Sequence, residues 1–162
     1  MDKFRSGYIV DKFGVTVGLT EENTAGMKFY GLLPHPTVKG DFQGARACVS
    51  VDGAPCVEGT ALLDTGLSVS FLSMPKGTVM KRGEDDHLLD GSVVSIRFGE
   101  PDATAVATEK FTVGRPVMPD VNPDNVTAVI RDPTFVNTGR KVYREWVTAF
   151  DGVVGRYGFR AA

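Results

Sequence analysis

Short segments rich in valine, threonine, phenylalanine and isoleucine follow one another along this chain, separated by glycine and proline. The 19 glycines and 9 prolines are spread over the 162 residues instead of being clustered. β-Branched and aromatic residues favour strands, and turn residues at such regular short intervals are typical of sandwiches and barrels. The sequence therefore predicts an all-β fold.

In the segment Ser92–Phe98, Val94, Ile96 and Phe98 occupy every second position, which predicts a strand with one buried face. One helix is expected, over Arg140–Glu145, and it is short. The expected strands are Tyr8–Asp11, Val15–Leu19, Met27–Leu33, Ala45–Val51, Val57–Leu63, Val69–Leu72, Ser92–Phe98, Ala105–Val113, Val126–Arg131 and Trp146–Phe150.

Length and charge limit the classes of function. A chain of 162 residues fits a single domain, 1–162, with a core large enough to be stable without disulfides or metals. The net charge of −2 predicts no nucleic-acid partner, and no apolar stretch is long enough to predict a membrane partner. The first seven residues lack the apolar core of a signal peptide, so secretion or a periplasmic location is expected only if a parent protein carries one.

Two cysteines flank a probable hairpin. Asp52-Gly53 between apolar arms predicts a two-residue turn, which places Cys48 and Cys56 on opposite faces of the ribbon. This register argues against a Cys48–Cys56 disulfide, although a bulge near Pro55 would change it. The two cysteines therefore do not decide between an oxidising and a reducing compartment.

The triplet Asp64-Thr65-Gly66 occurs once, at the end of the apolar segment 60–63 and before another apolar segment, 67–72. Gly66 has no side chain, so its N–H can approach a carboxylate closely, and the Thr65 hydroxyl can both donate and accept. Aspartic peptidases present their catalytic acid on such a turn. They need two carboxylates that share one proton, so a single triplet supplies half of a site. A simple capped turn at a strand end is the alternative interpretation.

The C-terminal part resembles the end of pepsin-like aspartic peptidases. Gly139 falls where that family places a glycine that crosses the catalytic loop, and Gly139-Arg140 is similar to the Gly-Arg of retroviral-type peptidases. Phe150-Asp151 and Gly158-Phe159 resemble the family's last two strands. Gly155 is a rival for the crossing position, but too few residues follow it for the expected helix and strand.

The resemblance extends upstream over nearly the whole chain. Gly31–Pro34, the Cys48 hairpin and Asp64 follow the order of a pepsin-like C-terminal lobe. Tyr8–Asp11 and Gly14–Thr20 look like the segment by which bacterial pepsin-like sequences enter that lobe. The resemblance implies an acid-protease-type closed β-barrel lobe with one short C-terminal helix, from a bilobal enzyme.

The resemblance implies that the chain functions as part of an aspartic endopeptidase. Asp64 would be catalytic, Thr65, Gly66 and Ser68 would build the active-site loop, and Gly139 would position it. The implied partners are a polypeptide substrate and a second lobe, with no cofactor or metal. His35 and His87 have no ligand spacing and are expected to be loop residues.

Two alternatives stay open. Two copies could pair by two-fold symmetry as a retropepsin-like homodimer of identical subunits, with the turn at Asp90 and Gly91 as the flap. Alternatively, the lobe could be a non-catalytic binding module, because pepsins usually carry serine or threonine where this chain has Leu67. Loss of that hydroxyl donor is expected to raise the pKa of Asp64 and to shift activity toward weakly acidic or neutral pH relative to pepsin.

Overall fold

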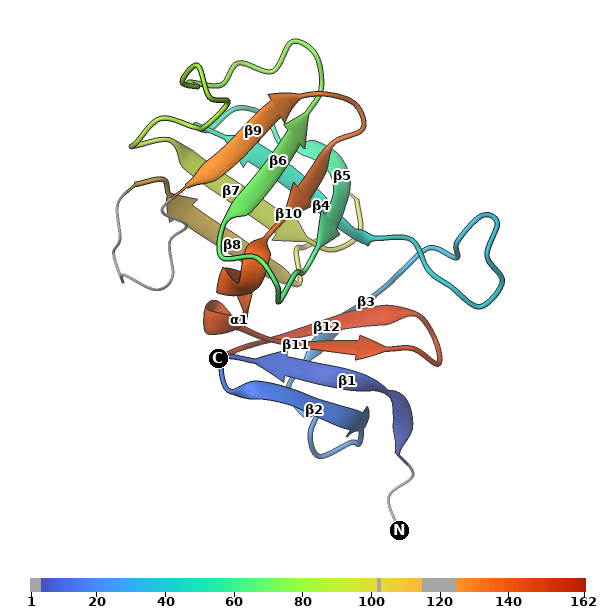
Figure 1. The fold of residues 1–162 in the computed structure, drawn as a ribbon. Helices are drawn as coiled ribbons and strands as arrows, with labels where there is room; N and C mark the ends of the chain where they lie inside the picture. The colour runs from blue at the N-terminus through green and yellow to red at the C-terminus, as the bar shows by residue number, and fades with distance from the viewer. Residues whose placement is uncertain (1–3, 102, 115–124) are drawn as a thin grey trace.

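Two β-sheets form the structure, a computed structural model that describes residues 4–101, 103–114 and 125–162 (Figure 1). The larger sheet has seven strands in the order β8 (Ala107–Thr112), β7 (Val93–Phe98), β4 (Ala45–Val51), β5 (Val57–Leu62), β10 (Phe135–Asn137), β6 (Ser70–Met74) and β9 (Val126–Ile130). The smaller sheet has five, in the order β2 (Gly14–Leu19), β1 (Arg5–Asp11), β11 (Trp146–Asp151), β12 (Arg156–Ala161) and β3 (Lys28–Gly31). The predicted all-β fold is confirmed.

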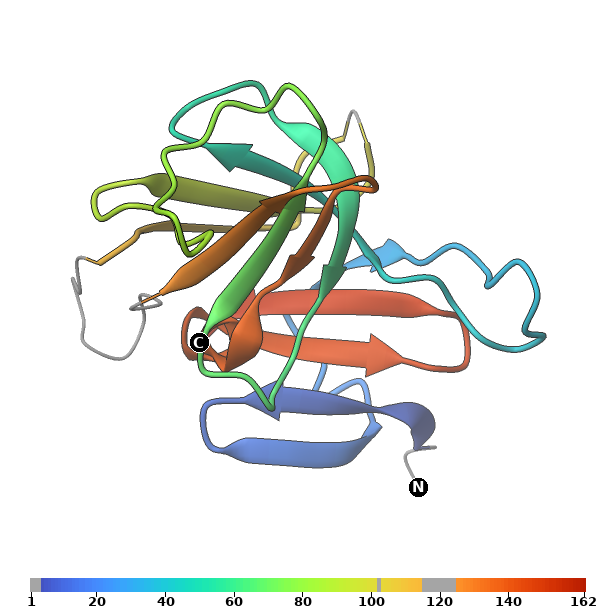
Figure 2. The same cartoon turned by 45° about the horizontal axis from the view of Figure 1, so that its top comes forward.

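The seven-stranded sheet curls around the main core, and the five-stranded sheet lies beneath it (Figure 2). Val94, Ile96 and Phe98 are fully buried, as their alternation predicted. A short helical segment connects the sheets: η1 (Gly139–Lys141) leads into α1 (Val142–Glu145), and Trp146 is extended again. Among the described residues, no helix is long and apolar enough to cross a membrane.

Strand β10 lies between β5 and β6, although it comes more than sixty residues after both. It runs parallel to β5 and antiparallel to β6, and Asn137 at its end pairs with Leu62 and Phe71. Because parallel strands end at the same edge of a sheet, the ends of β5 and β10 lie together. The loop that joins β5 to β6 must therefore pass over the end of β10.

The register expected for the cysteine hairpin is wrong by one residue. Val49 pairs with Val57 rather than with Cys56, so Cys48 and Cys56 are diagonal neighbours on one face. Their Cα atoms are 5.5 Å apart, and they form a disulfide. The Asp52-Gly53 turn is present, but pairing resumes only at Val57. The longer loop, which includes Pro55, reverses the faces of the second arm.

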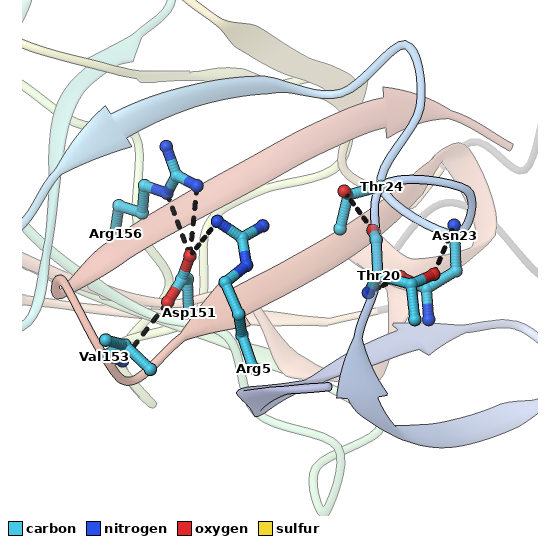
Figure 3. A network of polar contacts seen from close by, with 7 residues as sticks. All are labelled: Arg5, Thr20, Asn23, Thr24, Asp151, Val153 and Arg156. Atoms are coloured by element: carbon cyan, nitrogen blue, oxygen red, sulfur yellow. Dashed lines mark hydrogen bonds and ion pairs between the residues drawn. The ribbon is translucent and has the colours of Figure 1, made fainter. Parts of the chain in front are cut away.

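A buried carboxylate ties the smaller sheet together (Figure 3). Asp151, at the end of β11, is 0% exposed, and its Oδ2 lies 3.1 Å from Nη2 of Arg156 and 3.4 Å from Nη1 of Arg5. Its Oδ1 accepts a hydrogen bond from Val153 N–H in the β11–β12 turn. The two arginines come from β12 and β1, so one carboxylate links three neighbouring strands. The two ion pairs offset the cost of burying its charge.

Glu109 on β8 is a second buried carboxyl group, 2% exposed. Its pKa is raised to about 8, mainly by burial and also by the nearby Glu145 carboxyl, whereas Lys141 partly opposes the rise. Its Oε2 atom has no hydrogen-bond partner among the described residues. The folded chain thus holds a proton that the unfolded chain releases above pH 4.5 or so.

Glu109→Gln is expected to make stability less dependent on pH. The raised pKa stabilises the wild-type fold fully below about pH 4.5, and this contribution is lost as pH rises toward about 8. Because glutamine has no proton to lose, the variant should gain roughly 3–4 kcal/mol relative to wild type between pH 5 and pH 8. Urea unfolding of both proteins at these two pH values measures the gain. If the free energies of unfolding of the variant and wild type differ by the same amount at both pH values, the prediction is contradicted.

Candidate active site

Asp64 is held on the loop of residues 63–69 between β5 and β6. Its carboxylate is half-buried, whereas residues 65–69 are exposed. The loop lies on the side of the curled sheet that faces the five-stranded sheet (Figures 1 and 2). Oδ1 of Asp64 accepts a hydrogen bond of 2.7 Å from Gly66 N–H, within the predicted triplet.

The other carboxylate oxygen of Asp64 is bound by Asn137, which no sequence pattern had indicated as a site residue. Nδ2 of Asn137 donates to Oδ2 of Asp64 at 2.8 Å, and Gly139 N–H donates to Oδ1 of Asn137 at 2.9 Å. Asn137 ends β10, which is only three residues long and too short to show a period. Its position two residues before the expected crossing glycine was the only signal in the sequence.

The base of the loop is fixed from below by buried donors. The Tyr143 hydroxyl of α1 donates to Leu63 C=O at 2.7 Å, and Thr138 N–H donates to Leu62 C=O at 3.0 Å. Each bond joins the end of β5 to the segment after β10. The backbone that carries Asp64 is therefore held by residues 76 and 80 positions later in the chain.

Gly139 lies directly under the Asp64 loop. Arg140 N–H donates to Leu67 C=O at 2.7 Å, and Gly139 has a φ of +61°. A Cβ atom at Gly139 would lie 2.5 Å from the carbonyl oxygen of Val69 and 2.9 Å from that of Leu67. The structure thus brings Gly139 beside Asp64, whereas Gly155 lies in the β11–β12 turn.

The pKa of Asp64 lies below that of a free aspartate, and the rise expected relative to pepsin stays a prediction. The hydrogen bond from Asn137, followed by those from the Gly66 and Leu67 backbones, lowers this pKa below its ordinary value despite some desolvation. Leu67, 41% exposed, has no hydroxyl to offer, and Asn137 supplies a side-chain donor instead. Among the described residues, no second carboxylate contributes to the pKa of Asp64.

The remaining predicted site residues are arranged differently. Thr65 and Ser68 are exposed on the loop. The turn at Asp90 and Gly91 does not join two strands: no strand precedes it, and Gly91 N–H donates to Val113 C=O beyond the end of β8. The turn is therefore bound to the end of β8, and its role as a flap stays a prediction.

Metal ligands do not gather in the described part of the chain, where no group of three or more histidine, cysteine or acidic side chains is placed to hold an ion. His87 instead pairs with Asp85 at 2.7 Å. His35 lies in a loop, where its Nδ1 accepts a hydrogen bond from Val38 N–H.

Comparison with known proteins supports the fold but not a sequence family. No protein-family model matches the chain, and no curated protein matches it. Among solved structures, the likeness is to the pepsin-like aspartic protease fold. One such structure is basic 7S globulin from soybean, with a TM-score of 0.53 and 13% identity over 96% of this chain. This chain covers 50% of that protein's chain. At 13% identity the likeness is one of fold alone.

Proposed function

We propose that this chain is one lobe of an aspartic endopeptidase and supplies one of its two catalytic carboxylates, Asp64. The observation that carries the proposal is the accessible carboxylate at the end of β5, bound at both oxygens by donors and set on an exposed loop. Gly139 beneath the loop supports the proposal, because it lets the segment after β10 approach the loop that carries Asp64 closely. The substrate would be an extended polypeptide.

The proposed reaction needs one water and a second carboxylic acid. Asp64, ionised, accepts a proton from the water as the water oxygen bonds to the peptide carbonyl carbon. The carbonyl π bond opens, and its oxygen takes the proton from the second acid. The C–N bond then breaks as the nitrogen receives the proton held by Asp64, and the remaining diol returns a proton to the second carboxylate.

A second lobe is the preferred source of the other acid. The chain has about half the length of the soybean protein whose fold it shares, and the Asp64 loop presents exposed Leu67 and Val69 beside the carboxylate. A covering lobe would bury these side chains and desolvate the site. An identical subunit could do the same through two-fold symmetry.

Sedimentation combined with hydrolysis of a denatured protein between pH 3 and pH 7 tests the proposal. We expect an inert monomer that becomes active, and binds a pepstatin-type inhibitor, when it is produced together with the residues encoded directly upstream. An active dimer of the chain alone would support the identical subunit as the source of the second acid. A folded assembly of either kind without hydrolysis or inhibitor binding would refute catalysis and favour a binding module.

A further inference from the structure

Asn137 is bound at both ends of its amide, and these two bonds fix which end faces Asp64. Gly139 N–H can only donate, so the Asn137 atom that it contacts must be the carbonyl oxygen. The NH₂ group then necessarily points toward Oδ2 of Asp64, at 2.8 Å. The side chain is 8% exposed, so solvent competes little for either bond.

We propose that Asn137 is a positioning residue for the reaction proposed above. Asn137 holds the Asp64 carboxylate in its ionised form, and Asp64 therefore takes the role of the base. An amide NH₂ donates but has no accessible acid–base equilibrium, so it favours the ionised carboxylate at every working pH. The second acid, from the other lobe, would then carry the shared proton.

Desolvation of Asp64 opposes the ionised form, but the hydrogen bonds to its carboxylate outweigh it. The titratable group that faces its loop from α1 is Tyr143, whose pKa is raised by burial, so its hydroxyl stays neutral and donates to Leu63 C=O. The donors from Gly66 and Leu67 are backbone groups present in any loop of this shape. Asn137 is therefore the side chain through which this sequence sets the charge of Asp64.

Titration of the Asp64 carboxyl carbon by NMR in the isolated folded chain tests the proposal without requiring hydrolysis. Asn137→Leu should raise the pKa of Asp64 by about one unit through loss of the donor. Asn137→Asp keeps the size of the side chain but places a second carboxyl beside Oδ2, and it should raise one pKa of the pair by about two units or more. Asn23→Asp is the matched control: the Asn23 amide also donates within the protein, to Gly18 C=O, and its replacement should leave Asp64 unchanged.

An Asp64 pKa that is unchanged in both folded Asn137 variants would overturn the proposal, whatever the outcome of the hydrolysis assay. If the expected shifts occur in a chain that never hydrolyses peptides, the contact stands and the proposed function fails. In an active assembly, Asn137→Leu should move the acidic limb of the pH–rate profile upward by the same shift and lower kcat more than it changes KM. An unmoved acidic limb would likewise overturn the assignment of the base.

Discussion

Replacing Asp64 with asparagine is expected to lower kcat/KM of the proposed two-lobe peptidase by about 10³-fold or more, because asparagine cannot take the proton from the attacking water. The fold should survive. The residue is half-exposed on a loop, and the asparagine side chain can still accept a hydrogen bond from Gly66 N–H. Hydrolysis rates measured at several pH values and an unfolding curve for each variant separate the two effects.

Asp52→Asn is the matched control for charge and loop context. Asp52 is also a loop aspartate, and its Oδ1 accepts a hydrogen bond of 2.8 Å from Val93 N–H, but it belongs to the cysteine hairpin. Its replacement removes one negative charge and should leave kcat/KM within about twofold of wild type. Equal losses in the two variants, or full activity of Asp64→Asn, would exclude Asp64 as the base.

Gly139→Ala is expected to lower the free energy of unfolding by about 3–5 kcal/mol. Alanine would cost about 1–2 kcal/mol for the left-handed backbone alone, with φ at +61°. Its methyl group would also overlap the carbonyl oxygens of Val69 and Leu67, which belong to backbone and cannot rotate away. Urea unfolding gives the change in stability, and the NMR titration reports whether the Asp64 carboxylate remains bound.

Gly53→Ala is the control that separates the cost of the left-handed backbone from the cost of steric overlap by the added methyl group. Gly53 also has a positive φ, +76°, but nothing lies within 4 Å of a Cβ atom built there. The control should therefore cost only about 1–2 kcal/mol. If Gly139→Ala costs no more than Gly53→Ala, the Asp64 loop does not rest on Gly139 as closely as the structure indicates.

Local patterns predicted most of the strands and the turn that carries Asp64. Alternation in Ser92–Phe98 and the Asp-Thr-Gly turn are properties of a few consecutive residues, so they can be read without tertiary information. The short helix is also local, since Gly139 and the extended Trp146 bound it. These features account for the agreement between sequence and structure.

The length of one hairpin loop and contacts between distant segments decided what could not be predicted. The disulfide depended on one additional residue in a loop, which reverses the faces of a whole arm. The role of Asn137 depended on the insertion of β10 between two earlier strands, and the turn at Asp90 and Gly91 on its bond to Val113. Neither pairing leaves a periodic signal in the residues involved.

The insertion of β10 between β5 and β6 also sets the order in which this protein can mature. During synthesis the Asp64 triplet leaves the ribosome 73 residues before Asn137, a delay of roughly 4–15 s at ordinary elongation rates. Until then the two strands that flank the triplet lack the strand that separates them, and the carboxylate lacks its side-chain donor. A chain interrupted before residue 135 would carry the entire Asp64 triplet without Asn137 and Gly139, so the proposed site would be arranged only in a chain synthesised beyond β10.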